Sequence, residues 1–399
     1  MTKTCFFQIV CVLLFLTACS EKEIDPRKWY KGNLHTHSFW SDGDEYPEMI
    51  LSWYKSNGYD FVALSDHNIL AEGEKWITVP KSRMYEDGFQ NYLKKYGPDW
   101  VTYKTDTGRT QVKLKTYASY LPLFEDDGFL IIQSEEITDK FEGKPIHMNA
   151  TNVQTLIPPQ GGMSVTEVMQ RNVDAVLRQR KETGIPMFPH INHPNFYFAI
   201  TTQDIIGLKG ERFFEVFNGH PMVHNYGDSL RPGTEYIWDM INMAYYKKNQ
   251  PLLLGLATDD SHNYHQFGNA YSNAGRGWVM VLADSLSPES LIRAMEAGDF
   301  YSTTGVILEE VQLAMNALHV RVKEEPGVRY EIQFIGATAG EQNSRILKTF
   351  SGGLARIELL DEYIFVRAKV TSDKVKTNPF QDGDFESAWT QPVGGVGNQ

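Results

Sequence analysis

Two histidines one residue apart, His35 and His37, are the first residues in this chain whose types and spacing could do chemistry. They end what reads as a short strand, and both can turn toward one point if the chain bends there. Asp42, seven residues after His35, can close over the same point. Two imidazoles and a carboxylate form a metal-binding set. The alternative is a strand with two surface histidines beside a Ser-Asp-Gly turn, so later segments must decide.

Four later segments also place histidine or acidic residues where a predicted strand stops. They are Asp66-His67 after 61–65, Glu135-Glu136 after 129–133, His190 to His193 after 185–189, and Asp259-Asp260 with His262 after 252–256. In addition, ten of the eleven histidines fall between residues 35 and 265. Scattered surface histidines would not produce this pattern, which favours one shared site.

The elements that must position these residues alternate between strands and helices from residue 31 to about 304, which predicts a parallel sheet. At that length the natural form is a distorted (β/α)7-type barrel, whose chemistry lies at the carboxyl ends of the strands. The predicted fold class is α/β. Residues 305–399 alternate in strand fashion and predict a small all-β domain, with the tail at 388–392 packed against the first domain.

Residues 69–120 interrupt this alternation. The stretch is long, rich in Lys, Tyr and Gly, and carries no clear strand. Long excursions of this kind are often functional loops. We therefore predict an insertion or a lid over the site, the alternative being a surface excursion unrelated to function.

The first 18 residues predict a targeting segment, because Lys3 precedes an uncharged run that is too short to span a bilayer. Residues 16–19, Leu-Thr-Ala-Cys, resemble the bacterial lipoprotein box, which implies cleavage before Cys19 and acylation of that residue. Ser20 by the same resemblance favours the outer membrane. Residues 19–30 are then a polar tether. A plain secretory signal or an uncleaved anchor is the alternative.

Charge and cysteine content exclude several classes. The formal net charge is -12, and no basic run appears, which argues against nucleic acid. The three cysteines lie at 5, 11 and 19, within or at the end of the targeting segment. The mature chain would therefore lack a disulfide framework, a thiol nucleophile and a cysteine metal ligand.

Taken together, the motifs resemble the polymerase and histidinol phosphatase (PHP) domain. The chain carries His-x-His-Ser with Ser-Asp-Gly, then Asp-His-Asn, then Glu before a Thr, a lone His, His-Pro and Asp-x-His, in the ligand order of that family. The resemblance covers about residues 31 to 304 in its motifs. The segment 31–68 and the Ala388-Trp389 tail look most like the branch of CehA/McbA metallohydrolases.

The resemblance implies two or three divalent metal ions, with Zn, Mn or Fe suited to imidazole and carboxylate ligands. The implied ligands are His35, His37, Glu136 and Asp260 at a first position, Glu136 as a bridge with His147 and His193 at a second, and Asp42, His67 and His262 at a third.

Three of these choices have a runner-up close by. Glu135 competes with Glu136, Asp259 with Asp260, and His190 with His193. Asp66 is expected to orient His67 rather than to bind metal.

By the same resemblance, the expected function is hydrolysis of a phosphodiester or phosphomonoester on a small molecule by metal-activated water. A carboxylic or carbamic ester hydrolase on the same site is the alternative, and a non-catalytic binding lipoprotein is the rival from another class. The expected partners are a small-molecule ester and, through the N-terminal lipid alone, a membrane of the bacterial cell envelope.

Two further site residues are expected to act on the substrate. His190 would protonate the leaving group, with His220, His224 and His265 as alternatives. Many family phosphatases carry an Arg soon after the His-Pro, but here residues 195–198 are Asn-Phe-Tyr-Phe, which argues against a phosphomonoester. Arg276 is the predicted substitute anion contact, with a salt bridge as its alternative.

Overall fold

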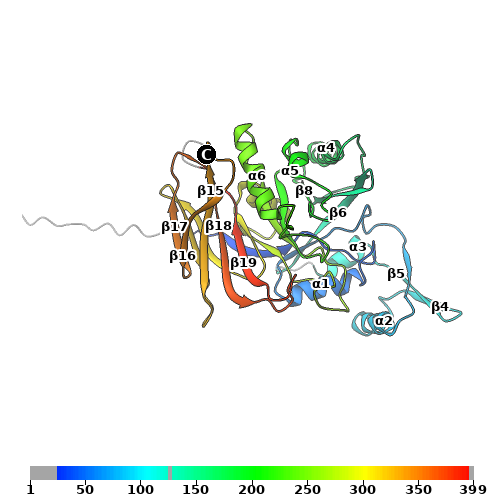
Figure 1. Ribbon diagram of the computed structural model, residues 1–399. Helices are drawn as coiled ribbons and strands as arrows, with labels where there is room; N and C mark the ends of the chain where they lie inside the picture. The colour runs from blue at the N-terminus through cyan, green and yellow to red at the C-terminus, as the bar shows by residue number, and fades with distance from the viewer. Residues whose placement is uncertain (1–24, 125–127, 395–399) are drawn as a thin grey trace, which may run out of the picture.

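The computed structural model describes residues 25–124 and 128–394 (Figure 1). The predicted signal peptide and Cys19 lie outside this part of the chain. Within the described part, no helix has the length and apolar character of a membrane-spanning segment. The predicted tether ends earlier than expected, because Lys28 already begins strand β1 (Lys28–Asn33) and pairs with Ala283 of β11 (Trp278–Ala283).

One hydrogen-bonded sheet of 13 strands forms the centre of the molecule. Eight consecutive strands of it surround the site, in the spatial order β10 (Leu254–Thr258), β9 (Phe213–Asn218), β8 (Phe188–Ile191), β7 (Lys144–Thr151), β6 (Leu130–Phe141), β2 (Phe61–Leu64), β1 and β11. The sheet curls until β10 lies against β11 and β12 (Phe300–Thr303). No ladder joins β10 to β11 among the described residues, so the predicted barrel is not closed by hydrogen bonds.

The sheet is mixed rather than parallel, because β6 and β7 form a hairpin that the sequence pattern does not predict. Glu142 (φ 49°) and Gly143 (φ 79°) make its two-residue turn, the left-handed geometry that suits twisted antiparallel strands. Strand β6 is therefore 12 residues long and does not end at residue 133. Glu136 and His147 consequently project from within paired strands, and only the other motifs lie at strand ends.

Helices pack on the outside of this sheet, where their apolar faces meet the strands. They are α1 (Pro47–Ser56) beside β2, α4 (Val165–Thr183) beside β7 and β8, α6 (Thr234–Lys247) beside β9, and α7 (Pro288–Ala297) beside β11, with the short α5 (Thr202–Ile206) between α4 and α6. Helix α4 begins after Ser164, whose side chain accepts a hydrogen bond from Glu167 N at 3.1 Å. Gly184, with φ 71°, ends it.

The segment 69–120 has a structure of its own, which corrects the prediction of a strandless stretch. It contains a sheet of β3 (Trp76–Thr78), β5 (Arg109–Lys113) and β4 (Tyr103–Asp106), with α2 (Arg83–Tyr96) and α3 (Tyr117–Tyr120). These strands are short and rich in Lys and Thr, and in β5 only Val112 is fully buried. Their sequence therefore lacks the alternation of apolar and polar residues that predicts a strand. The segment packs on Trp40 and Tyr46, which flank Asp42, in one apolar cluster. It therefore supports the loop that carries Asp42.

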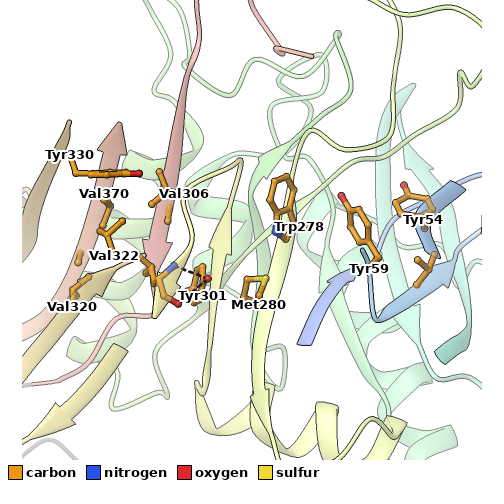
Figure 2. Close-up of a cluster of buried hydrophobic side chains, with 14 of the residues drawn as sticks. Tyr54, Tyr59, Trp278, Met280, Tyr301, Val306, Val320, Val322, Tyr330 and Val370 are labelled. Carbon is orange, nitrogen blue, oxygen red and sulfur yellow. Dashed lines mark hydrogen bonds between the residues drawn. The ribbon is translucent and has the colours of Figure 1, made fainter. Parts of the chain in front are cut away.

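The described residues after 305 form strands, but they do not make a detached domain. Strands β13 (Leu308–Ala314), β14 (Ala317–Val322) and β17 (Leu354–Glu358) form a separate three-stranded sheet, whereas β19 (Phe385–Thr390), β18 (Tyr363–Val375), β15 (Tyr330–Thr338) and β16 (Arg345–Ser351) extend the central sheet from β12. Figure 2 shows the shared core, in which Tyr54 and Trp278 belong to the same cluster as Val320 and Tyr330.

The end of the described chain also packs on the first part of the fold, as predicted. Trp389 stacks on Phe217 of β9 with ring centroids 6.1 Å apart. The side-chain amide of Gln391 accepts a hydrogen bond from Gly255 N at 2.8 Å and donates one to Gly255 O at 3.0 Å. The tail thus fixes two strands that lead to the site.

Candidate metal centre

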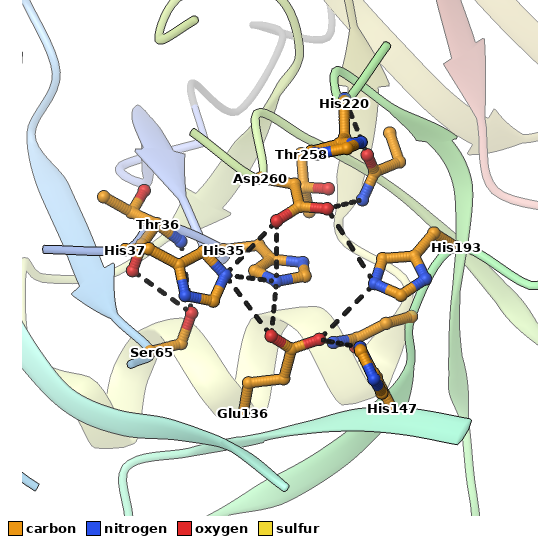
Figure 3. A network of polar contacts seen from close by, with 12 residues as sticks. His35, Thr36, His37, Ser65, Glu136, His147, His193, His220, Thr258 and Asp260 are labelled. Carbon is orange, nitrogen blue, oxygen red and sulfur yellow. Dashed lines mark hydrogen bonds and ion pairs between the residues drawn. The ribbon is translucent and has the colours of Figure 1, made fainter. Parts of the chain in front are cut away.

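The structure brings all nine predicted ligands to one place. His35, His37 and Asp42 follow β1, His67 follows β2, Glu136 lies on β6, His147 on β7, His193 follows β8, and Asp260 and His262 follow β10. Figure 3 shows the inner part of this cluster, where His35 and His37 lie opposite His147 and His193 with Glu136 and Asp260 between them.

The first predicted metal position has four ligand atoms at suitable spacing. Nε2 of His35 and Nε2 of His37 lie 3.1 Å apart, and each is 3.2 Å from Oδ1 of Asp260. Oε2 of Glu136 lies 3.5 Å from the first nitrogen and 3.3 Å from the second. Ligand atoms held about 2.1 Å from a tetrahedral ion stand about 3.4 Å apart. This geometry therefore fits a four-coordinate divalent ion.

Glu136 presents one oxygen to each of two histidine groups. Oε2 faces His35 and His37, whereas Oε1 lies 3.1 Å from Nδ1 of His147 and 3.4 Å from Nε2 of His193. Asp260 repeats this arrangement, since its Oδ2 lies 3.8 Å from Nε2 of His193. Carboxylates placed in this way can bridge two ions.

The third predicted position lies nearer the surface. Asp42, whose side chain is 58% exposed, has Oδ1 at 3.4 Å from Nε2 of His262 and Oδ2 at 3.6 Å from Nε2 of His67. The His37 ring stacks on His262 at 4.0 Å, and its Nδ1 lies 3.8 Å from Asp42. His37 thus stands between the first and third positions.

Two buried atoms in the cluster indicate that the donor set fits metal ions. Oε2 of Glu136 and Nδ1 of His147 make no hydrogen bond among the described residues, although each has an oppositely charged neighbour at 2.8 or 3.1 Å. Leaving buried polar atoms without hydrogen bonds is costly. A metal ion at the first position would engage Oε2 of Glu136, and one at the second would engage Nδ1 of His147.

The charges in the cluster set the protonation of its ligands. Burial alone would raise the pKa of Glu136, but His67, His35 and His147 hold it well below its ordinary value. Burial and the neighbouring His262 and His67 lower the pKa of His37 to about 3, so this ring is neutral and able to coordinate. Burial opposes protonation of His67 as well, yet Glu136 and Asp42 raise its pKa to about 11.

Metal binding is therefore expected to release a proton. With its pKa raised to about 11, His67 of the metal-free chain is protonated on both ring nitrogens near neutral pH, and coordination through Nε2 must displace the proton on that nitrogen. Apparent affinity should thus rise with pH, by up to about tenfold per pH unit for one released proton. Calorimetric titration of Zn²⁺ in two buffers of different ionisation enthalpy measures the proton count. An affinity that is unchanged between pH 6 and 8 would contradict this expectation.

Glu215 is a functional residue that the sequence motifs do not include. It lies on β9, and its Oε1 accepts a hydrogen bond from Nδ1 of His35 at 2.7 Å and one from Thr258 Oγ1 at 2.8 Å. Its Oε2 accepts from the backbone N of His193 at 2.7 Å. A carboxylate bound to the far nitrogen of a ligating imidazole fixes the tautomer and the ring orientation. The signal was available as one carboxylate in the buried strand Phe-Phe-Glu-Val-Phe.

Substitution of this carboxylate should weaken metal binding without removing a ligand. We expect Glu215→Gln to lower the affinity for Zn²⁺ by about 10- to 100-fold, because His35 loses its charged partner. Competition with a chromogenic chelator measures the change. The matched control is Glu211→Gln, which replaces a buried carboxyl that bonds to Tyr245 away from the cluster. Equal affinity in the two variants would contradict the orienting role.

Two buried asparagines, also absent from the predicted set, hold the bridging carboxylates. Nδ2 of Asn192 donates to Oε1 of Glu136 at 2.7 Å. Nδ2 of Asn218 donates to Oδ2 of Asp260 at 3.1 Å. Such bonds leave the outer lone pairs of each carboxylate free for metal.

The structure separates the first two runner-up residues from the ligands. Glu135 points away from the cluster, where its Oε1 accepts a hydrogen bond from Ile157 N at 2.6 Å. Asp259 accepts from Tyr54 Oη at 2.8 Å and from the backbone N of Gly275 and of Gly277, each at 2.9 Å. Glu136 and Asp260 are thus the carboxylates placed for coordination.

His190 does not occupy the position expected of a proton donor. It is fully buried on β8, and its Nε2 faces Oε1 of Glu215 at 3.4 Å. Glu215 also holds His35, so His190 lies beneath the ligand layer. The role predicted for His190 is therefore corrected: it packs behind the cluster instead of facing a substrate.

Arg276 is also placed differently from its prediction. Its guanidinium is buried and donates to the backbone O of Gly219 at 2.8 Å, of Tyr271 at 2.6 Å and of Gly268 at 2.7 Å. These bonds tie three loop segments together. Arg276 is thus neither a substrate contact nor a partner in a salt bridge among the described residues.

Asp66 organises the loop before the third position rather than His67. Its carboxylate accepts hydrogen bonds from Ser38 N at 2.8 Å, Ser38 Oγ at 2.7 Å and Ser41 Oγ at 2.6 Å. Nδ1 of His67 instead bonds to Thr138 Oγ1. Asp66 therefore helps to set the position of Asp42, which follows Ser41.

Among the remaining histidines, His220 lies beside the cluster. Its ring is 5.5 Å from the His262 ring and 5.5 Å from that of Phe196. Its Nδ1 accepts a hydrogen bond from Met222 N at 3.2 Å, which leaves Nε2 for other partners. By contrast, His224 stacks on Phe198 at 4.4 Å, and Nε2 of His265 bonds to Asp44 O at 3.0 Å.

Phe196 forms an apolar wall next to the second metal position. Its ring lies 5.0 Å from the His193 ring and 6.2 Å from the His147 ring. His147 also lines a cavity of about 460 Å³, whose wall includes Asp139 and Lys140. Aromatic and charged side chains thus both lie near the second metal position.

The sequence matches no family model and no curated protein. Several solved structures are similar to this chain. One is a two-domain protein containing a predicted PHP-like metal-dependent phosphoesterase from Bacteroides vulgatus, with 15% identity and a TM-score of 0.40 over 92% of this chain and 96% of that chain. Another is a putative metal-dependent phosphoesterase from Bifidobacterium adolescentis, with 12% identity and a TM-score of 0.28 over 59% of this chain and 88% of that chain. A third is an amidohydrolase from Chromobacterium violaceum with bound sulfate, with 11% identity and a TM-score of 0.30 over 67% of this chain and 96% of that chain. At these identities and TM-scores, the likenesses establish neither the family nor the function of this chain.

Proposed function

We propose that this chain is a metal-dependent hydrolase of the PHP type, nearest to the CehA/McbA branch, acting on a phosphoester of a small molecule. One observation carries the proposal. Glu136 is fully buried, and its two oxygens face two different histidine groups at 2.8 to 3.5 Å. A buried carboxylate placed between two groups of imidazoles is the arrangement of a bridged metal centre.

When bound, two or three divalent ions such as Zn, Mn or Fe supply Lewis acidity and lower the pKa of water. The residues of the protein hold the metal positions and contact the leaving group. Glu136 and Asp260 hold the two inner positions together, and Glu215 accepts a hydrogen bond from Nδ1–H of His35, which directs Nε2 toward the cluster. Burial lowers the pKa of His220 to about 4, so its ring is neutral, and because Nδ1 accepts a hydrogen bond the ring proton lies on Nε2. Nε2 makes no hydrogen bond among the described residues and lies beside His262, where it is placed to donate a hydrogen bond to the leaving group.

A carboxylic or carbamic ester is the second candidate substrate, and a specific observation favours it. Phe196 covers His193 and His147 where family phosphatases carry an Arg. Tyr197 next to it is 59% exposed. An aromatic wall gives no countercharge to a doubly charged phosphomonoester, so a phosphodiester or an uncharged ester suits it better.

The test is a substrate panel on metal-reconstituted full-length protein. Bis-(4-nitrophenyl) phosphate, 4-nitrophenyl phosphate and 4-nitrophenyl acetate are compared after loading with Zn²⁺, Mn²⁺ or Fe²⁺. We expect metal-dependent turnover of the diester or the acetate and little of the monoester. Activity should disappear on chelation and return on metal addition.

Protein shown to hold metal but unable to turn over any of the three esters would overturn the hydrolase proposal. Protein that binds no metal after supplementation would point instead to a non-catalytic binding lipoprotein. The net charge of -12 makes nucleic acid an unsuitable substrate in either case.

We further propose that the mature protein is anchored in the bacterial envelope by lipid on Cys19, with the outer membrane as its destination. The basis is the sequence of residues 16–19, which lies outside the described residues. Metabolic labelling with radioactive palmitate should mark the wild type and leave Cys19→Ser unlabelled. Label that persists in this variant would contradict acylation at Cys19.

A further inference from the structure

A cavity of about 680 Å³ lies away from the metal cluster. It is enclosed by α1, the segment 267–275, β11 and the C-terminal segment 376–386, and none of the nine candidate metal ligands lines it. Its volume is in the range of small-molecule sites, about 300 to 1,000 Å³. No function described above uses it.

Aromatic side chains form much of the wall. Trp53, Tyr59, Phe267 and Trp278 all line the cavity. Tyr59 and Trp278 meet edge to face with ring centroids 6.1 Å apart (Figure 2), and Phe267 is 60% exposed. Flat apolar walls of this kind accept a planar ring.

Two lysines line the same cavity without a carboxylate partner among the described residues. Nζ of Lys31 lies 3.8 Å from the Tyr59 ring centre and 4.4 Å from that of Trp278, and donates to Asn57 O at 3.3 Å. Nζ of Lys376 donates to Arg276 O at 3.2 Å. Rings and carbonyls offer only partial negative charge. Carboxylates attract the lysines from beyond salt-bridge distance, Asp259 and Asp60 for Lys31, and Asp384, Asp259 and Glu386 for Lys376. Burial nevertheless lowers the pKa of each lysine to about 8.

Two buried polar atoms of the wall also lack partners. Neither Nε1 of Trp278 nor Oη of Tyr59 makes a hydrogen bond among the described residues. Both groups are donors, so the residues that line the cavity add unpaired donors to the positive charge of the two lysines. A buried donor without a partner is unfavourable.

Two acidic residues limit the charge of that ligand. Asp382 is exposed at the cavity, and Glu386 lines it while pairing with Lys374 at 3.4 Å. Their negative charge disfavours a dianion such as a phosphate monoester. A single negative charge is compatible with both lysines and both carboxylates.

We propose that this cavity is a second binding site, for a small organic monoanion in which a carboxylate is carried on an aromatic ring. The carboxylate meets Lys31 and Lys376, and the ring lies among Trp53, Phe267 and Trp278. The site is independent of the metal centre and of the proposed hydrolysis.

The test is calorimetric titration of metal-free, full-length protein with indole-3-acetate, and with indole-3-acetamide as its neutral counterpart. We expect one indole-3-acetate to bind per chain, at least tenfold more tightly than the amide. Lys31→Met and Lys376→Met should each weaken binding at least tenfold. The control Lys181→Met, an exposed residue of α4, should leave it unchanged.

Equal binding of the acetate and the amide would overturn the monoanion assignment. Binding that survives both lysine substitutions, or an absence of binding at millimolar indole-3-acetate, would overturn the site. Thermal unfolding of each variant verifies folding, and if Lys376→Met does not fold, the half-buried Lys31 alone decides the outcome.

Discussion

Glu136→Gln is expected to abolish turnover and to empty part of the metal centre. Glutamine keeps the size of the side chain but loses the charge and one of the two ligating oxygens, so it cannot bridge. Without that charge, no carboxylate of residue 136 balances the positive charge of the surrounding His67, His35 and His147. We expect a fall in kcat of about a thousandfold or more, comparable with the removal of a principal electrostatic element. Metal analysis should show a loss of at least one ion per chain.

Glu135→Gln is the matched control, because it makes the same chemical change one residue earlier on the same strand. Burial raises the pKa of Glu135 to about 8, so this carboxyl is largely protonated at pH 7 and an amide imitates it. Its bond from Ile157 N can be kept by the amide oxygen. Metal content and turnover should stay within a few-fold of the wild type. Similar losses in both variants would mean that the bridge does not depend on Glu136.

The clustering of the nine candidate ligands could be predicted from sequence because residue type and position agree. His35, His37 and His193 stand directly after strands in the sequence, and strand ends meet in a curled sheet. The hairpin of β6 and β7 was not predicted, yet Glu136 and His147 still face the cluster. His147 pairs with Thr138, which lies two residues after Glu136 on β6. Side chains two residues apart on a strand lie on the same face of the sheet, so Glu136 and His147 share one face.

The supporting residues could not be predicted in this way, because their roles depend on contacts between distant segments. Glu215 accepts a hydrogen bond from His35, which lies 180 residues earlier in the sequence. An isolated carboxylate in an apolar strand signals a buried partner but does not name it. The predictions for His190 and Arg276 were wrong for the same reason. Both side chains could act on a substrate, but His190 is buried behind the cluster and the guanidinium of Arg276 donates to backbone carbonyl oxygens.

The boundary at residue 305 could be placed from strand alternation, but the independence of the C-terminal strands could not be judged from it. Alternation reports local structure, whereas joining of two sheets depends on which edges pair. Here Tyr301 of β12 pairs with Thr390 of β19, so the last strands complete the central sheet. The fold is therefore one connected structure across this boundary.

Arg367→Met should show how strongly that connection stabilises the protein. Arg367 of β18 is buried and forms two hydrogen bonds to Asp239 of α6, with Nε–Oδ1 at 2.7 Å and Nη2–Oδ2 at 3.0 Å. Methionine fills a similar volume but leaves the buried Asp239 without its cation. Breaking one side of a buried pair typically costs about 3 to 5 kcal/mol in the free energy of unfolding. Urea unfolding followed by circular dichroism measures the loss.

The chain offers a matched exposed pair as the control. Arg329 also bonds to an aspartate, with Nε–Oδ2 of Asp373 at 2.7 Å, but its side chain is 89% exposed. Solvent screens such a pair and solvates either partner when the other is removed. Arg329→Met should therefore leave the unfolding midpoint almost unchanged. Equal shifts in the two variants would mean that β18 and α6 are held together by apolar packing alone, and that the buried charge pair fixes only their relative position.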